Sequence, residues 1–296
     1  MSPRSEDKLS YGLVDFLQNL VLRALIGGIR LLPYRWRSPL CGFVTARVIA
    51  PLAGYPRRIR ENLALVYPDL PAAEVRRLIH RVSHNAGATL IEVYSGADFR
   101  KAVASSPVLG EGLAALIAAK ERGQGVLLIS GHFGNYDVPR AVLSSLGHPV
   151  GALYKPFRNG YFDAHYRKTI SEIGTPIFPR GRRGLAEMVR FLRRGGMVGM
   201  LIDQSVARSP RLPFLGRPAR TATSAAELAL KYGLLLVPVY GRRTAGATGT
   251  GFDLIVEAPV PHSDPLTMTK ALNASLEAQV RAHPDQWLWI HKRWKR

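Results

Sequence analysis

The chain has 296 residues, 47% of them hydrophobic, which is ample for a folded core in one large or two modest domains. Its one cysteine, Cys41, excludes an internal disulfide and a cysteine-based zinc site. The formal net charge of +20 predicts a polyanionic partner, namely nucleic acid, anionic lipid or an acidic protein.

An apolar amphipathic stretch begins the chain. Residues 9–32 carry polar side chains on one side of a helix and apolar side chains on the other. Asp15, Arg23 and Arg30 interrupt it, which argues against a clean transmembrane span, and no signal-peptide cleavage site follows. We therefore predict a membrane-associating segment over residues 1–40, lying flat on an anionic cytoplasmic leaflet, and a second domain over residues 41–296. A helix packed on the domain and a single tilted span are the alternatives.

Further along, apolar runs alternate with helical patterns. Strands are predicted at residues 126–129, 150–154, 176–178, 197–202, 234–240 and 252–257, and helices at 138–146, 161–173, 185–194 and 222–232. This alternation indicates an α/β fold with a largely parallel sheet flanked by helices, preceded by a helical region of about 110 residues.

The motif SGHFGNYD at residues 130–137 directly follows the first of these strands. His132 in the turn and Asp137 at the helix start can meet, because Gly131 and Gly134 permit a sharp turn. Asn135 is a candidate N-cap. An imidazole oriented by a carboxylate can act as a general base on an alcohol, although a histidine that only caps the strand is the alternative.

Several other blocks accompany this motif in a fixed order. They are RRIRENL at residues 57–63, YKPFRN at 154–159, DQ at 203–204, PFLG at 213–216 and PDQWLWIH at 284–291. Together with HFGNYD they resemble the bacterial lipid A biosynthesis acyltransferases, the lauroyl/myristoyl transferase branch of the glycerolipid acyltransferase superfamily with its His-x4-Asp/Glu motif. The resemblance covers nearly the whole chain. One position departs from that branch, which more often has Glu where Asp137 stands.

The resemblance implies transfer of an acyl chain from acyl carrier protein, or from acyl-CoA, to a hydroxyl of a lipid A precursor at the cytoplasmic face of the bacterial inner membrane. His132 is then the base and Asp137 its orienting carboxylate, with no acyl-enzyme, cofactor or metal. Backbone donors near Gly131 and the helix start are expected to stabilise the oxyanion. The further substrate-binding candidates are Asn135, Arg158, Asn159, Arg167, Arg180, Arg182, Asp203 and Gln204.

Each group of candidates has its own basis and its own alternative. The arginines can hold lipid phosphates as planar forks, and residues 180–184 form a possible phosphate-binding turn before a helix, unless this is a solvated loop. Asp203 and Gln204 follow a predicted strand, where ligands of open α/β sheets usually bind, but a structural role for Asp203 is equally consistent. Phe214, Leu215, Trp287, Trp289 and Trp294 either line an acyl groove or form ordinary core.

Other functions stay open from the residues alone. The acceptor could be another membrane lipid, such as a lysophospholipid or a phosphoglycolipid. A nucleic-acid-binding protein fits the charge but lacks a finger, RNP or helix-turn-helix signature, so no nucleic-acid partner is expected. A serine hydrolase lacks the Gly-x-Ser-x-Gly elbow, and a zinc hydrolase lacks His-Glu-x-x-His.

Overall fold

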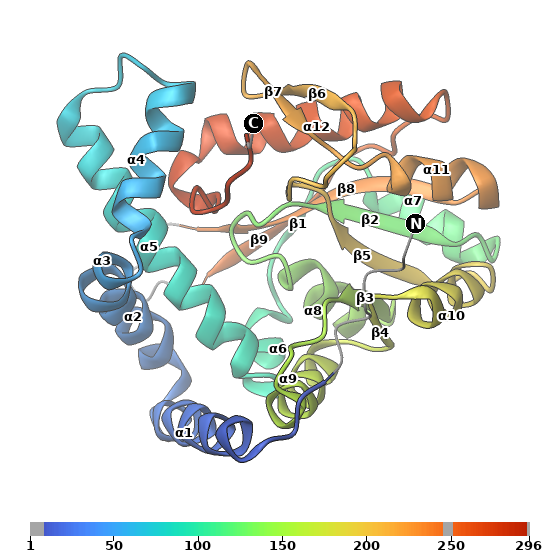
Figure 1. Ribbon diagram of the computed structural model, residues 1–296. Coiled ribbons are helices and arrows are strands. Elements are labelled where there is room, and N and C mark those ends of the chain that lie inside the picture. Colours follow the sequence, from blue (N-terminus) through green and yellow to red (C-terminus); the bar gives the residue numbers. More distant parts are fainter. Residues whose placement is uncertain (1–8, 245–250, 295–296) are drawn as a thin grey trace.

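The computed structural model describes residues 9–244 and 251–294. At its centre is a seven-stranded sheet with the strand order β1-β9-β8-β2-β5-β3-β4 (Figure 1). Its strands are β1 (Val108–Leu109), β2 (Val126–Ser130), β3 (Val150–Tyr154), β4 (Ile177–Pro179), β5 (Met197–Leu201), β8 (Leu235–Arg243) and β9 (Phe252–Val256). A separate hairpin is formed by β6 (Arg211–Phe214) and β7 (Arg217–Arg220). Neither β1 nor this hairpin was predicted from the sequence.

The sheet is largely parallel, as predicted. β2 lies in the middle and pairs in parallel with both β5 and β8, while β3 joins β5 to β4. The exception is the β8–β9 pair, which is antiparallel, and β1 runs parallel to β9. All five residues of β2 are buried, because helices cover both faces of the sheet at this position. The carboxyl ends of β2, β5, β3 and β4 consequently share one edge of the sheet.

Five of the α-helices after the first 110 residues occupy connections between strands, and the last one follows the last strand. They are α7 (Leu113–Glu121), α8 (Val138–Ser145), α9 (Gly160–Ile173), α10 (Arg182–Leu192), α11 (Ser224–Tyr232) and α12 (Pro265–Ala282), with a short 3₁₀ turn η2 (Pro284–Gln286). α8 and α9 pack on one face of the sheet, whereas α10, α11 and α12 contribute to a second core on the other face (Figure 1). Gly233 ends α11 in the left-handed conformation (φ 63°), which glycine adopts without a Cβ clash.

The amino-terminal region is helical, as predicted. It contains α1 (Leu13–Arg30), α2 (Tyr34–Val44), the π-helical turn η1 (Thr45–Ile49), α3 (Ala50–Leu52), α4 (Tyr55–Val66), α5 (Ala72–Tyr94) and α6 (Ala97–Val103). α5 passes beneath the sheet edge and contacts α2, α4, α9 and η2. Because α2 runs through residue 40, the structure has no break at the predicted boundary between residues 40 and 41. Residues 1–8 of the predicted segment lie outside the described residues.

α1 turns its apolar side outward. Leu13, Leu17 and Leu20 are more than half exposed, while Asn19 is buried against the protein. Ile26 and Ile29 pack against the cluster of Ile91, Tyr94 and Phe162, so α1 packs on the domain and also turns much of its apolar side outward. In residues 9–244 and 251–294, no helix has the length and apolar character needed to cross a bilayer.

Candidate active site

Four polar side chains follow neighbouring strands at the carboxyl edge of the sheet. His132 follows β2, Asp203 follows β5, Lys155 follows β3 and Arg180 follows β4. In open α/β sheets this edge is where ligands bind, because the loops there come together while the strands fix their spacing. The site is therefore built from segments that are up to 71 positions apart in the chain.

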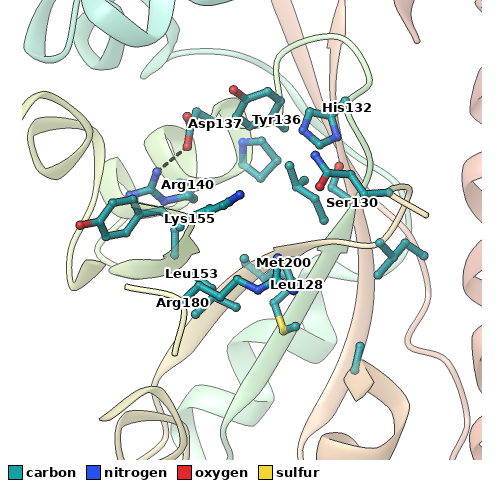
Figure 2. A pocket seen from close by; sticks show the side chains of 18 of the residues that line it. Leu128, Ser130, His132, Tyr136, Asp137, Arg140, Leu153, Lys155, Arg180 and Met200 are labelled. Atoms are coloured by element: carbon teal, nitrogen blue, oxygen red, sulfur yellow. Dashed lines mark hydrogen bonds and ion pairs between the residues drawn. The ribbon is translucent and has the colours of Figure 1, made fainter. Parts of the chain in front are cut away.

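A cavity of about 500 Å³ opens at this edge (Figure 2). Its apolar part is lined by Leu128, Leu153, Met200 and Val239, from strands β2, β3, β5 and β8. His132, Lys155, Arg180 and Gln204 bring polar groups to the same cavity. A pocket with apolar walls and a few converging polar groups is typical of a site for an amphiphilic ligand.

His132 is held by Asp203. The imidazole Nδ1 lies 2.8 Å from Asp203 Oδ1, and the backbone N–H of His132 donates to Asp203 Oδ2 at 2.8 Å. The indole N–H of Trp287 donates to the same Oδ2 at 3.0 Å. With Nδ1 engaged by a carboxylate, Nε2 is left as the nitrogen that can accept a proton from a ligand. The side chain of His132 is 16% exposed, so solvent and ligands reach it through the cavity.

Asp203 stays ionised although it is fully buried. Burial is the largest single influence and raises its pKa, but the charge and hydrogen bonds of His132, with the charge of His291, hold the pKa well below its usual range. An ionised carboxylate at this position stabilises the imidazolium that forms when His132 takes up a proton. The arrangement thus suits a general base.

The ring of His291 packs edge-to-face on His132, with 4.7 Å between the ring centroids. Burial and the neighbouring charge of His132 lower the pKa of His291 to about 4. His291 is therefore neutral at physiological pH. Its segment is held by Asn62 of α4, whose amide donates to the carbonyls of Trp289 at 2.7 Å and His291 at 2.9 Å. The early and final blocks quoted from the sequence thus meet in space.

Asp137 does not hold His132, contrary to the prediction. Its carboxylate forms a buried ion pair with Arg140, and Figure 2 shows it turned toward that residue. Arg140 also donates to the carbonyl of Gly174 at 2.7 Å, which fixes the pair between α8 and α9. Asp137 lines the cavity, but the hydrogen bonds place Asp203 in the orienting role. Arg140 lies three residues after Asp137, close enough for its guanidinium to bind the carboxylate in place of His132.

Asn135 lies in the loop that carries His132, and its side chain makes hydrogen bonds within the protein. It is completely buried, its amide donates to Glu92 Oε2 at 2.9 Å, and its side-chain oxygen accepts from the Asp137 N–H at 2.9 Å. Glu92 in turn receives two hydrogen bonds from Arg243, at 2.6 and 2.9 Å. The prediction that Asn135 is the N-cap is wrong, because Asp137 occupies that position, while the substrate-binding role of Asn135 stays a prediction.

The loop's backbone donors are also engaged within the protein. The N–H groups of residues 132, 133, 134, 135, 137 and 138 all donate to other atoms of the chain. Gly134 adopts φ 54° and approaches the carbonyl of Gly241, so only glycine fits there. Gly131 is packed against Leu276 and Asp203. These six N–H groups therefore have partners within the protein.

The other predicted ligand-binding residues separate into two groups. Arg180 and Gln204 line the cavity. Arg158, Arg167 and Arg182 are exposed and lie outside its lining. Asn159 caps α9, accepting from the Phe162 N–H at 3.0 Å, and its amide donates to the carbonyl of Asp15 at 2.7 Å. Asn159 therefore joins the start of α1 to the segment after β3, and its amide groups are engaged in doing so.

The remaining apolar and aromatic candidates form part of the hydrophobic core. Phe214, Leu215, Trp287 and Trp289 are buried, and Trp294 packs against them, in a cluster that includes Ile59 and Leu63 of α4. None of the five lines the cavity over the described part of the chain. Of this group, only Trp287 reaches the site, through its bond to Asp203.

The comparison with known families bears directly on this site. A sequence model of the bacterial lipid A biosynthesis acyltransferases matches residues 4–296. The chain belongs to this family. It is an acyltransferase of lipid A biosynthesis, in agreement with the resemblance noted from the sequence.

Individual relatives are distant but extensive. The lipid A biosynthesis palmitoleoyltransferase of Escherichia coli (strain K12) is 25% identical over 271 residues, which cover 89% of this chain and 86% of that protein. The lauroyltransferase of the same strain is 26% identical over 245 residues, 80% of this chain and 78% of that protein. The myristoyltransferase of that strain is 22% identical over 285 residues, 91% of this chain and 84% of that protein.

Proposed function

We propose that this acyltransferase moves a fatty acyl chain from an acyl carrier protein thioester, or from acyl-CoA, to a hydroxyl of a lipid A precursor. The observation that carries the proposal is the His132–Asp203 pair at an apolar-walled cavity, in a chain that belongs to the lipid A acyltransferases. The donor, the acceptor hydroxyl and the mechanism are parts of this proposal.

His132 acts as the general base of the transfer. Its Nε2 accepts the proton of the acceptor hydroxyl, while Asp203 holds Nδ1 and stabilises the imidazolium. The alkoxide oxygen attacks the thioester carbonyl, the C–S bond breaks, and the departing thiolate takes the proton from His132. No acyl-enzyme forms. Asp137 contributes indirectly, because its ion pair with Arg140 fixes the helix that follows the His132 loop.

The acyl chain occupies the apolar part of the cavity. Leu153 and Met200, which are partly buried, offer it a surface without hydrogen-bonding groups, where each buried methylene contributes about 0.8 kcal/mol. Gly199 also lines this part, and the absence of a side chain there leaves space for the ligand. The exposed Arg158, Arg167 and Arg182 lie where a phosphorylated headgroup outside the cavity can pair with them.

Residues 1–40 associate with the membrane through α1, at the cytoplasmic face of the inner membrane. The support is the outward apolar side of α1, which continues over α2 and η1 with Trp36, Phe43 and Val48, each more than half exposed. Arg23 and Arg30 of α1 add charge that attracts anionic headgroups. The link from Asn159 to Asp15 keeps this surface beside the segment after β3, whose Lys155 and Phe157 line the cavity.

Lipid masses test the proposed reaction. Purified enzyme is incubated with acyl carrier protein thioesters and either a lipid A precursor, a lysophospholipid or a phosphoglycolipid, and the products are weighed by mass spectrometry. We expect a mass gain on the lipid A precursor and its loss with His132→Ala. A gain on one of the other lipids alone refutes the acceptor, and full transfer by His132→Ala refutes the mechanism.

Vesicle sedimentation tests the membrane role. Replacing Leu13, Leu17 and Leu20 together by serine removes exposed apolar surface, so we expect the enzyme to leave vesicles that contain anionic lipid. Serine at Leu109, Ile117 and Leu146, which are exposed on the catalytic domain, serves as the matched control. Equal binding by both variants contradicts the role of α1.

A further inference from the structure

Lys155 and Arg180 are placed side by side by the sheet. Tyr154 of β3 pairs in parallel with Pro179 of β4, and the N–H of Arg180 donates to the carbonyl of Tyr154 at 2.7 Å. Lys155 and Arg180 are thus the first residues beyond a matched pair of strand ends. Both line the cavity, and Figure 2 shows both side chains reaching into it from the side opposite His132.

Lys155 and Arg180 bring basic side chains to the cavity. Its described lining contains one acidic residue, Asp137, and that carboxylate is paired with Arg140. Asp203, behind His132, is likewise engaged by three hydrogen bonds within the protein. Two cationic side chains thus reach the cavity, each on a residue that is itself exposed.

The reaction needs groups that stabilise negative charge on the thioester carbonyl oxygen. When an alkoxide attacks a thioester, the carbonyl oxygen becomes negative, and acyl-transfer enzymes commonly stabilise this charge with backbone N–H groups. Here the N–H groups of residues 132–135, 137 and 138 donate within the protein. Lys155 and Arg180 line the cavity across from the base and carry the positive charge that such an oxygen attracts.

We propose that Lys155 and Arg180 stabilise the oxyanion of the acyl transfer. This inference rests on the proposed function. As the acceptor oxygen bonds to the thioester carbon, the electron pair of the C=O bond moves to its oxygen, which lies between the Lys155 ammonium and the Arg180 guanidinium. The pair returns as the C–S bond breaks, and the thiolate receives the proton held by His132. No further reactant is required.

Methionine substitutions test the assignment, since methionine keeps much of the length of both side chains and removes their charge. For Lys155→Met and Arg180→Met we expect kcat to fall by about 10²-fold each, with little change in the KM for donor or acceptor. Lys155→Arg, which restores the charge, is expected to recover most of kcat. Arg183→Met is the matched control: Arg183 is 93% exposed, pairs with Glu187, and lies outside the cavity lining.

An acceptor without phosphate shows which anion Lys155 and Arg180 bind: the oxyanion of the reaction or a phosphate of the lipid. If the two cations bind the acceptor's phosphate, the variants raise the acceptor KM, and their defect disappears once that phosphate is removed. That result, or an unchanged kcat in both variants, overturns the proposal. A defect in kcat that persists with the phosphate-free acceptor supports it. Absence of transfer by the unmodified enzyme from any thioester to the lipid A precursor would instead refute the proposed function itself.

Discussion

Replacing Asp203 by asparagine decides which carboxylate serves the base. Asp203 accepts three hydrogen bonds at 2.8 to 3.0 Å from His132 and Trp287, and it is fully buried. Asparagine retains a single oxygen, so at least one of these donors faces an NH₂ group. If that donor is the His132 ring, the wrong tautomer is favoured and Nε2 carries the proton. We therefore expect kcat/KM to fall about 10²- to 10⁴-fold, with the acceptor KM little changed.

Asp137→Asn is the comparison that makes this experiment informative. Asp137 and Arg140 are each 6% exposed, and breaking a buried ion pair costs about 3–5 kcal/mol of stability. We expect this variant to unfold at lower urea concentration, while its folded fraction keeps the base-dependent limb of the pH–rate profile. The reasoning is refuted if Asp203→Asn retains kcat/KM within about threefold and Asp137→Asn loses that limb.

Three further changes probe the pocket, the pH response and the loop support. Gly199→Val narrows the cavity. If the valine excludes two terminal methylenes of the acyl chain, at about 0.8 kcal/mol each, the preference between two competing acyl thioesters shifts toward the shorter one by about 15-fold. An unchanged product ratio counts against the placement of the acyl chain in this cavity. The pKa of His291 is lowered from 6.5 to about 4, so as the pH falls the unfolded chain takes up this proton before the folded protein does. The contribution of His291 to the free energy of unfolding is therefore fully present above pH 6.5 and is lost as the pH falls toward 4, a change of about 3 kcal/mol. Urea unfolding at pH 7 and pH 4.5 should accordingly show a weaker pH dependence for His291→Gln, and identical dependence in both proteins would contradict this. Glu92→Gln weakens the buried pair with Arg243 and is expected to cost about 3–5 kcal/mol, whereas Arg242→Gln, at a partly exposed pair, should cost about 1 kcal/mol or less in the same measurement.

The predictable part of the fold was carried by local patterns. The strand at residues 150–154 was predicted to the residue, and α9 began one residue before its predicted start. These elements have uninterrupted apolar runs or clear helical periods. β1 has two residues and the β6–β7 hairpin has exposed arginines and prolines, so neither offers such a pattern. α10 begins at Arg182, three residues before its predicted start, because its first turn is polar and gives no apolar pattern from which to predict it.

The site required information that no local pattern contains. His132 and Asp203 are brought level by the parallel register of β2 and β5, in which Ser130 pairs with Leu201. That register follows from the order of strands in the sheet, so the sequence indicated Asp203 near the site without indicating its partner. Asp137 lies five residues after His132, which made their pairing plausible, but Arg140 lies only three residues after Asp137 and binds its carboxylate. Glu92, from α5, was missed because its contacts to Asn135 and Arg243 are entirely long-range.

The bond from Trp287 to Asp203 has a consequence for the order in which the enzyme is made. A chain emerges from the ribosome amino end first, so α1 and its apolar surface are available to a bilayer long before residue 287 has been synthesised. His132 and Asp203 also emerge earlier, but the indole that completes the hydrogen bonds of Asp203, and the His291 ring that packs on His132, arrive last. The contacts that the final block of the chain makes with Asp203, His132 and α4 are therefore the last part of the site to form.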